Sequence, residues 1–188
     1  MIIAEFEGVC KLGMPNPTLV DWIDITVFIL AIIACFKSAK LAMLSEKNWW
    51  YRLSVILSLL VINKFLFIDF CVSQLFSSLA RQVELYSLRR GFQALLVLSI
   101  SVVLIVSSYQ FQQKLSRYSV YLKWSYLACD GLIILMLLRL ISLHQIDALL
   151  YIDWLGLGIG LNWIVEIICN ALIILFACIN IQQHQKFK

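Results

Sequence analysis

Five long apolar segments dominate the sequence and restrict the chain to a membrane fold. They span about residues 21–44, 53–80, 92–111, 121–143 and 161–181. A helix needs about 20 apolar residues to cross the roughly 30 Å of hydrocarbon in a bilayer. Because every backbone polar group in hydrocarbon needs an internal partner, such spans are helical. The sequence therefore predicts an all-α bundle of five transmembrane helices, forming a single domain over residues 1–188, with the lipid bilayer as its surroundings.

The composition supports a membrane protein and argues against several other classes. Of the 188 residues, 62% are hydrophobic and 14% are charged, whereas soluble domains are about 45–50% apolar and about 25% charged. The net charge of +4 comes without a basic surface interleaved with aromatic residues, so we expect no nucleic acid as a partner. The six cysteines form no C-x-x-C pair, and five lie in apolar segments. We interpret them as packing residues and expect neither a metal site nor a cofactor.

The distribution of lysine and arginine predicts the orientation. Nine basic residues fall on one side of the predicted spans (Lys37, Lys40, Lys47, Arg52, Lys114, Arg117, Lys123, Lys186 and Lys188), and four fall on the other (Lys11, Arg81, Arg89 and Arg90). The richer side is expected to be cytoplasmic. This places the N-terminus outside and the C-terminus in the cytoplasm, and we expect the bacterial cytoplasmic (inner) membrane.

The segment before the last helix carries a distinct pattern. Residues 145–160 include "GLGIG", with glycines at positions 156, 158 and 160. Alternate glycines permit a sharp bend or the close approach of two backbones. We expect a short interfacial or re-entrant piece there.

Polar residues gather along one side of the second predicted helix. At about 100° per residue, its polar side chains fall within an arc of roughly 140°; they are Asn63, Asp69, Ser73, Gln74, Ser77 and Arg81. Lys64 lies about 100° from Asn63, outside that arc. The opposite face, with Leu57, Leu60 and Phe65, is expected to face lipid.

Other helices bring polar groups to a similar depth. Asn162, Glu166 and Asn170 are spaced i, i+4, i+8 and form a stripe on the fifth helix. Further polar residues lie on the fourth helix, in the loop after it and at the start of the third helix. Because all these residues are expected at a similar depth, the sequence predicts a polar pocket in the outer half of the bilayer. The candidate ligand-binding or ion-pathway residues are Asn63, Lys64, Asp69, Gln74, Arg81, Arg89, Arg90, Gln93, Arg139, His144, Asp147, Asn162 and Glu166.

Two interpretations of these residues remain open. Intramembrane ionisable groups commonly mark ligand or ion pathways, which predicts a protein that binds or conducts a small charged species. Five cations facing three anions favour a small anionic ligand, whereas His144 favours a proton. Alternatively, the protein is a structural anchor or assembly factor, and its polar residues only fix how the helices pack. In that case Asp69, Asp147 and Glu166 neutralise the basic residues, which are Arg139, Lys64 and one of Arg89 and Arg90.

An enzymatic alternative uses the same groups. A membrane-embedded hydrolase or transferase acting on a lipid-linked anionic substrate would use Glu166 or Asp69 as general base and His144 as proton carrier, with Arg89 and Arg90 binding the anion. A zinc site from His144, Asp147 and Glu166 is allowed by spacing, but nothing in the sequence demands it. Because 188 residues without a repeat make a small transporter, we expect a homo-oligomer or one subunit of a larger membrane complex.

Overall fold

The computed structural model describes three continuous parts of the chain, residues 19–66, 118–141 and 160–186. It also describes a few separate positions in the third predicted segment, namely residues 99, 102–103, 106, 108–110 and 113. The side chains of residues 139–141 and 186 are not part of this description.

The three continuous parts form four long helices and contain no β-strand pairing between them. These are α2 (Leu19–Leu41), α3 (Leu44–Leu66), α6 (Val120–Ile141) and α8 (Leu161–Lys186). Each is long and apolar enough to cross a membrane. The described part of the chain is therefore all-helical, with four candidate spans, as expected for a multi-pass integral membrane protein.

The predicted segments correspond to these helices with shifts at their ends. The first, fourth and fifth predictions differ from α2, α6 and α8 by a few residues, chiefly at the C-terminal ends of α2 and α8. The second was placed too late, because α3 already begins at Leu44. Trp50 belongs to that helix and is completely buried, so this part of the "NWWY" stretch packs inside the protein. The described positions between 99 and 113 are helical, and a fifth span there stays a prediction, as does the re-entrant piece before α8.

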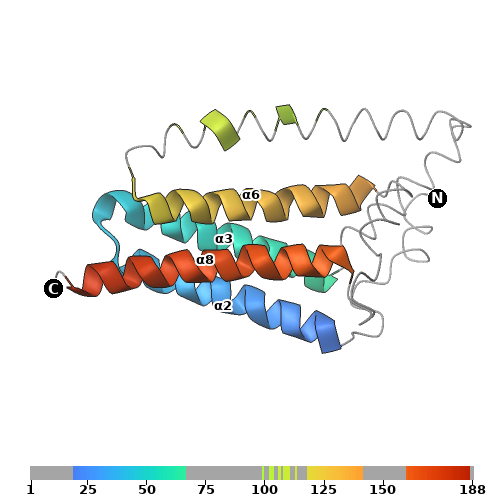
Figure 1. Cartoon of the computed structure of the whole chain (residues 1–188), viewed down its shortest axis with the longest axis horizontal. Helices are drawn as coiled ribbons and strands as arrows, with labels where there is room; N and C mark the ends of the chain where they lie inside the picture. The colour runs from blue at the N-terminus through green and yellow to red at the C-terminus, as the bar shows by residue number, and fades with distance from the viewer. Residues whose placement is uncertain are drawn as a thin grey trace, which may run out of the picture.

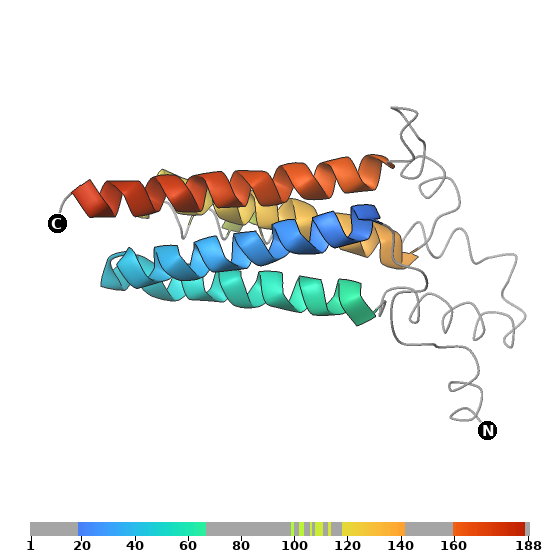
Figure 2. The ribbon, with the colours of Figure 1, turned by 90° about the horizontal axis from the view of Figure 1, so that it is seen from below.

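The four helices lie side by side as a bundle, with α2 and α8 running in one direction and α3 and α6 in the other (Figures 1 and 2). Only Ala42 and Met43 separate α2 from α3, so these two helices are antiparallel neighbours. α2 also packs against α8, which packs against α6, and α6 closes the bundle against α3. Every helix therefore contributes one side to a common core.

The buried stripes follow the three- and four-residue spacing of helix packing. On α2 the stripe consists of Asp24, Phe28, Ala31, Cys35 and Ser38, and on α8 it consists of Asn162, Glu166, Asn170, Ile173, Ala177 and Asn180. Small residues in these stripes let the backbones approach closely, which is how helices associate in lipid. Gly131 on α6 also faces α8, where an added Cβ would lie at an ordinary contact distance of 3.5 Å from the Cys169 sulfur.

The outside of the bundle is apolar. Large side chains such as Leu30, Leu59 and Leu175 are 51%, 61% and 52% exposed, respectively. A single exposed leucine is ordinary on a soluble protein, but here such side chains recur on every described helix. This surface suits acyl chains and supports an integral membrane protein.

Hydrogen bonds join the helices at the end of the bundle that holds the α2–α3 hairpin and the C-terminus of α8 (Figure 1). Asn180 Nδ2 donates to Ser38 Oγ at 2.7 Å inside the core. The backbone N–H of Ser119, just before α6, donates to Glu46 Oε1 at 2.7 Å, and its hydroxyl bonds Glu46 Oε2 at 3.1 Å. We call this the basic end, because Lys37, Lys40, Lys47, Arg52 and Lys123 lie in the helical turns near it.

Candidate functional site

Three charged side chains from three helices meet near the other end of the bundle. The Lys64 ammonium, from α3, donates hydrogen bonds to Asp24 Oδ2 on α2 and to Glu166 Oε2 on α8. Both contacts are ion pairs. We call Asp24, Lys64 and Glu166 the acid–lysine cluster.

Helix periodicity explains why these three residues meet. Asp24 and Glu166 occupy positions in the buried stripes of α2 and α8. On α3, Trp50, Leu53 and Leu57 are completely buried, and continuing the same three- and four-residue spacing reaches Leu60 and Lys64. The charged side chains on the interior sides of these three helices are therefore in contact with one another.

The cluster is shielded from its surroundings. The side chains of Asp24, Glu166 and Lys64 are 0%, 6% and 12% exposed, respectively. A buried charge is costly unless it is paired and hydrogen-bonded. Lys64 supplies a partner for both acids, but when all three groups are ionised their summed charge is −1. Asp24 Oδ1 is also buried and has no hydrogen-bond partner among the described residues.

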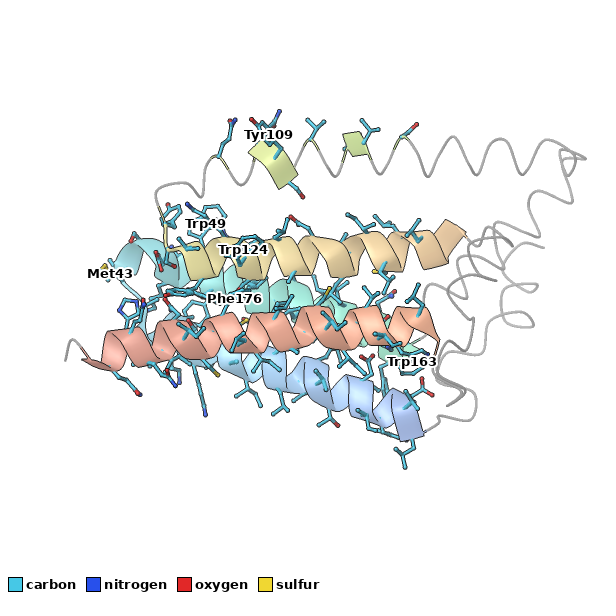
Figure 3. The ribbon with its side chains drawn as sticks, viewed as in Figure 1. Met43, Trp49, Tyr109, Trp124, Trp163 and Phe176 are labelled. Carbon is cyan, nitrogen blue, oxygen red and sulfur yellow. The ribbon has the colours of Figure 1, made fainter. Side chains whose placement is uncertain are left out.

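Two aromatic rings lie close to the same ammonium. Lys64 Nζ lies 4.6 Å from the ring centre of Trp163 and 5.8 Å from that of Phe28. Figure 3 shows Trp163 on α8 at the far end from Met43. A cation within about 6 Å of an aromatic face is attracted by the electrons of the ring. The ammonium is therefore held by two carboxylates and two rings.

A small cavity adjoins the cluster. Its volume is about 30 Å³, and it is lined by Phe28, Leu60, Asn63, Lys64, Leu132, Met136 and Glu166. One water molecule requires about 10–15 Å³ measured in this way, so there is room for one or two water-sized species. Among the described residues of the wall, Asn63, Lys64 and Glu166 are polar and the others are apolar.

The asparagines of α8 extend the polar stripe on both sides of Glu166. Asn170 Nδ2 donates to the backbone oxygen of Glu166 at 3.0 Å. Asn162, one turn before Glu166, is completely buried, and its side-chain amide has no partner among the described residues. The structure confirms that Asn162, Glu166 and Asn170 share one buried face.

The depth of the cluster follows from helix geometry. Asp24 lies 16 residues before Lys40 on the continuous helix α2, which corresponds to about 24 Å at 1.5 Å per residue. If Lys40 lies at the headgroups of the basic end, the cluster lies roughly three quarters of the way across the hydrocarbon of about 30 Å.

The sequence-predicted candidates divide into three groups. Asn63, Lys64, Asn162 and Glu166 lie in or beside the cluster. Arg139 belongs to α6, but its side chain is not described. Asp69, Gln74, Arg81, Arg89, Arg90, Gln93, His144 and Asp147 lie outside the described residues. The enzymatic interpretation and the possible zinc site depend mainly on this last group. Within the described residues no three His, Cys, Asp or Glu side chains gather as they would around a metal ion.

The faces assigned to α3 from its sequence were partly wrong. Leu57 was expected to face lipid but is completely buried, and Leu60 lines the cavity, whereas Phe65 is exposed as predicted. Lys64, expected off the polar face, points into the bundle. Angular clustering of polar residues misled the prediction because packing in this helix follows the Trp50–Leu53–Leu57 stripe.

Asp24 is the residue that the sequence reasoning missed. It was absorbed into an apolar span and not counted among the intramembrane charges. Its spacing of four residues from Phe28 and seven from Ala31 places it on the buried stripe of α2, and this periodicity was the available signal.

A second acid, Asp130 on α6, lies apart from the cluster. Ser108 Oγ donates to Asp130 Oδ2 at 2.7 Å, which connects the described part of the 99–113 segment to α6. Asp130 lies ten residues after the start of α6, which is about 15 Å along that helix. Its Ser108 contact lies on a different side of α6 from the cavity residues Leu132 and Met136.

Comparison of the chain with protein-family models, with curated protein sequences and with solved structures finds no match.

Proposed function

We propose that this multi-pass membrane protein binds or conducts a small cation, a proton in the simplest case, at the acid–lysine cluster in the outer half of the bilayer. One observation carries the proposal: two buried carboxylates share a single ammonium beside a cavity large enough for water. Intramembrane ionisable residues facing a bundle interior commonly mark ion and proton pathways.

The sign of the charge favours a cation over an anion. The sequence tally of five cations against three anions omitted Asp24 and relied on arginines and acids outside the described residues. In the described cluster, one lysine faces two acids. Uptake of one positive charge removes the net charge of −1 from a region where charge is costly.

The orientation and setting of the protein form part of this proposal. We assign the basic end to the cytoplasm, because loops rich in lysine and arginine are found on that side of a membrane. In this orientation the cluster lies nearer the outer leaflet, and the C-terminus is inside. The bacterial cytoplasmic membrane is the proposed location. Since the chain is short for a transporter built from paired repeats, we propose that it acts as a homo-oligomer or with other membrane subunits.

A structural role is the second candidate, and a specific contact favours it. Lys64 already touches both carboxylates directly, so the cluster links α2, α3 and α8 in one register. In that case the cluster fixes helix packing and takes up no ion. The two candidates differ in what the removal of one negative charge does.

Glu166→Gln separates them, with Glu46→Gln as a matched control at the basic end. The change leaves a neutral Asp24–Lys64 pair and keeps the side-chain shape. Proton uptake by the purified protein is measured by infrared difference spectroscopy during acid titration, and proton flux is measured in vesicles under an imposed potential.

Under the cation proposal, Glu166→Gln removes a carboxyl band and the proton uptake or flux of the wild type, with little loss of thermal stability. Glu46→Gln keeps the uptake or flux that depends on the cluster. Equal uptake and flux in the wild type and Glu166→Gln, together with a lower melting temperature in Glu166→Gln, would establish the structural role instead.

A further inference from the structure

We infer that the acid–lysine cluster and its adjoining cavity form a binding site for a small ammonium-type cation, ammonium itself or methylammonium. This inference rests on the proposed function and names the chemical class of the cation. Its starting point is the group that already occupies the cluster, which is itself a primary ammonium.

The surroundings of Lys64 Nζ have the chemistry of an ammonium site. Asp24 and Glu166 accept its hydrogen bonds. The distance from Nζ to the ring centre is 4.6 Å for Trp163 and 5.8 Å for Phe28. Carboxylates with aromatic faces are the combination by which proteins recognise organic ammonium groups. Lys64 therefore acts as a tethered occupant of this site.

The cavity offers a second position with part of the same chemistry. Glu166 and Phe28 contact the Lys64 ammonium and also line the cavity, where Asn63 adds a side-chain amide. A cation seated there brings the summed charge of the cluster from −1 to zero. Lys64 also lines the cavity, so its ammonium repels this cation, but the attraction of two carboxylates outweighs the repulsion of one ammonium.

The walls of the cavity favour ammonium over metal cations. Hard cations such as calcium and magnesium take six or more oxygen ligands, but among the described residues lining this cavity only Glu166 and Asn63 carry side-chain oxygens. The apolar side chains of Leu60, Leu132 and Met136 also line the cavity. An ammonium ion needs fewer acceptors and is attracted by a ring face, and a cavity with room for one or two water-sized species suits ammonium or methylammonium better than the bulkier tetramethylammonium.

The test measures thermal unfolding of the full-length protein in mild detergent with chloride salts at constant ionic strength. Ammonium and methylammonium should raise the melting temperature in a saturable manner, because a ligand that binds only the folded state stabilises it. Sodium, potassium and tetramethylammonium should give no such saturable rise. An equal rise with sodium or potassium, or no rise with ammonium, overturns the inference.

A cavity-filling variant locates the effect. Met136→Phe adds volume to the cavity wall and should remove the ammonium-specific shift while leaving proton uptake by the carboxyl groups. Leu127→Phe is the matched control, since Leu127 lies on the same helix and is 46% exposed on the apolar surface. An undiminished shift in Met136→Phe places the bound cation elsewhere and overturns the assignment.

A second variant keeps the inference testable if Met136→Phe fails to fold. Lys64→Ala deletes three methylene groups and the ammonium, which together match propylammonium. Propylammonium should restore the melting temperature of Lys64→Ala, whereas sodium at the same ionic strength should not. Failure of propylammonium to exceed sodium refutes an ammonium site.

The two proposals fail in different ways. Proton uptake without any preference for ammonium overturns the ammonium assignment and leaves the proposed function intact. Absence of both proton uptake and cation binding overturns the proposed function, and the ammonium site with it.

Discussion

Replacing Lys64 with methionine tests how strongly the acid–lysine cluster holds the bundle together. Methionine keeps an unbranched side chain but removes the charge, which leaves Asp24 and Glu166 facing each other with side chains 0% and 6% exposed. Breaking a buried ion pair by removing one partner costs about 3–5 kcal/mol. One ammonium forms ion pairs with two acids here, so we expect a loss toward the upper end of that range, which corresponds to a factor of about 10³ to 10⁴ in the unfolding equilibrium.

Restoring charge balance should reverse most of this loss. The triple change Lys64→Met, Asp24→Asn and Glu166→Gln removes all three charges and should recover a large part of the stability, because a neutral polar group costs less to bury than an unpaired charge. The loss in Lys64→Met should also shrink at acidic pH, because protonated carboxyl groups do not need an ammonium partner.

Equilibrium unfolding in mixed micelles, followed by far-ultraviolet circular dichroism, measures these differences. Lys37→Met on α2 is the matched control, because Lys37 is an exposed lysine at the basic end. If Lys64→Met proves no more destabilising than Lys37→Met, or if the triple variant is less stable than Lys64→Met, the electrostatic reasoning is wrong.

Three further predictions concern the packing around the cluster. Gly131→Ala should be neutral or slightly stabilising, because its Cβ meets Cys169 at an ordinary contact distance of 3.5 Å and alanine favours the helix over glycine by about 1 kcal/mol. Gly131→Leu, in contrast, should separate α6 from α8 and lower the melting temperature. Asn180→Ala should cost about 1–3 kcal/mol by leaving the buried Ser38 hydroxyl without its partner, as measured by the same unfolding assay; no change would mean that this bond contributes nothing. Glu46→Ala should cost about 0.5–2 kcal/mol by removing the carboxylate that caps the start of α6, with faster amide hydrogen exchange in the first turn of α6; unchanged exchange there would contradict the capping role.

The stripe on α8 shows what could be read directly from local sequence. Asn162, Glu166 and Asn170 recur every fourth residue in an apolar segment, and the structure confirms that all three are buried on one face. The helical class and four of the spans were similarly predictable, because hydrocarbon permits few backbone conformations. The physical cause lies within a single helix, so no knowledge of its neighbours was needed.

The acid–lysine cluster, in contrast, depends on which helices are neighbours. Lys64 was recognised as an intramembrane charge, but its partners lie 40 residues earlier and 102 residues later in the chain. Summed charge along the sequence suggested an anionic ligand, and it was the packing of α2 beside α3 and α8 that brought Asp24 to the lysine. An electrostatic interaction of this kind depends on distance in space, which sequence separation does not give.

The amino-acid sequence by itself determined that this protein is helical, apolar on its outer surface and suited to a membrane, because backbone hydrogen bonding and hydrocarbon leave little choice. Only the tertiary structure decided that one lysine forms ion pairs with two acids and lies close to two aromatic rings. The physical reason is that the cost of burying each charge depends on side chains delivered by other helices, and three separate helices supply this cluster.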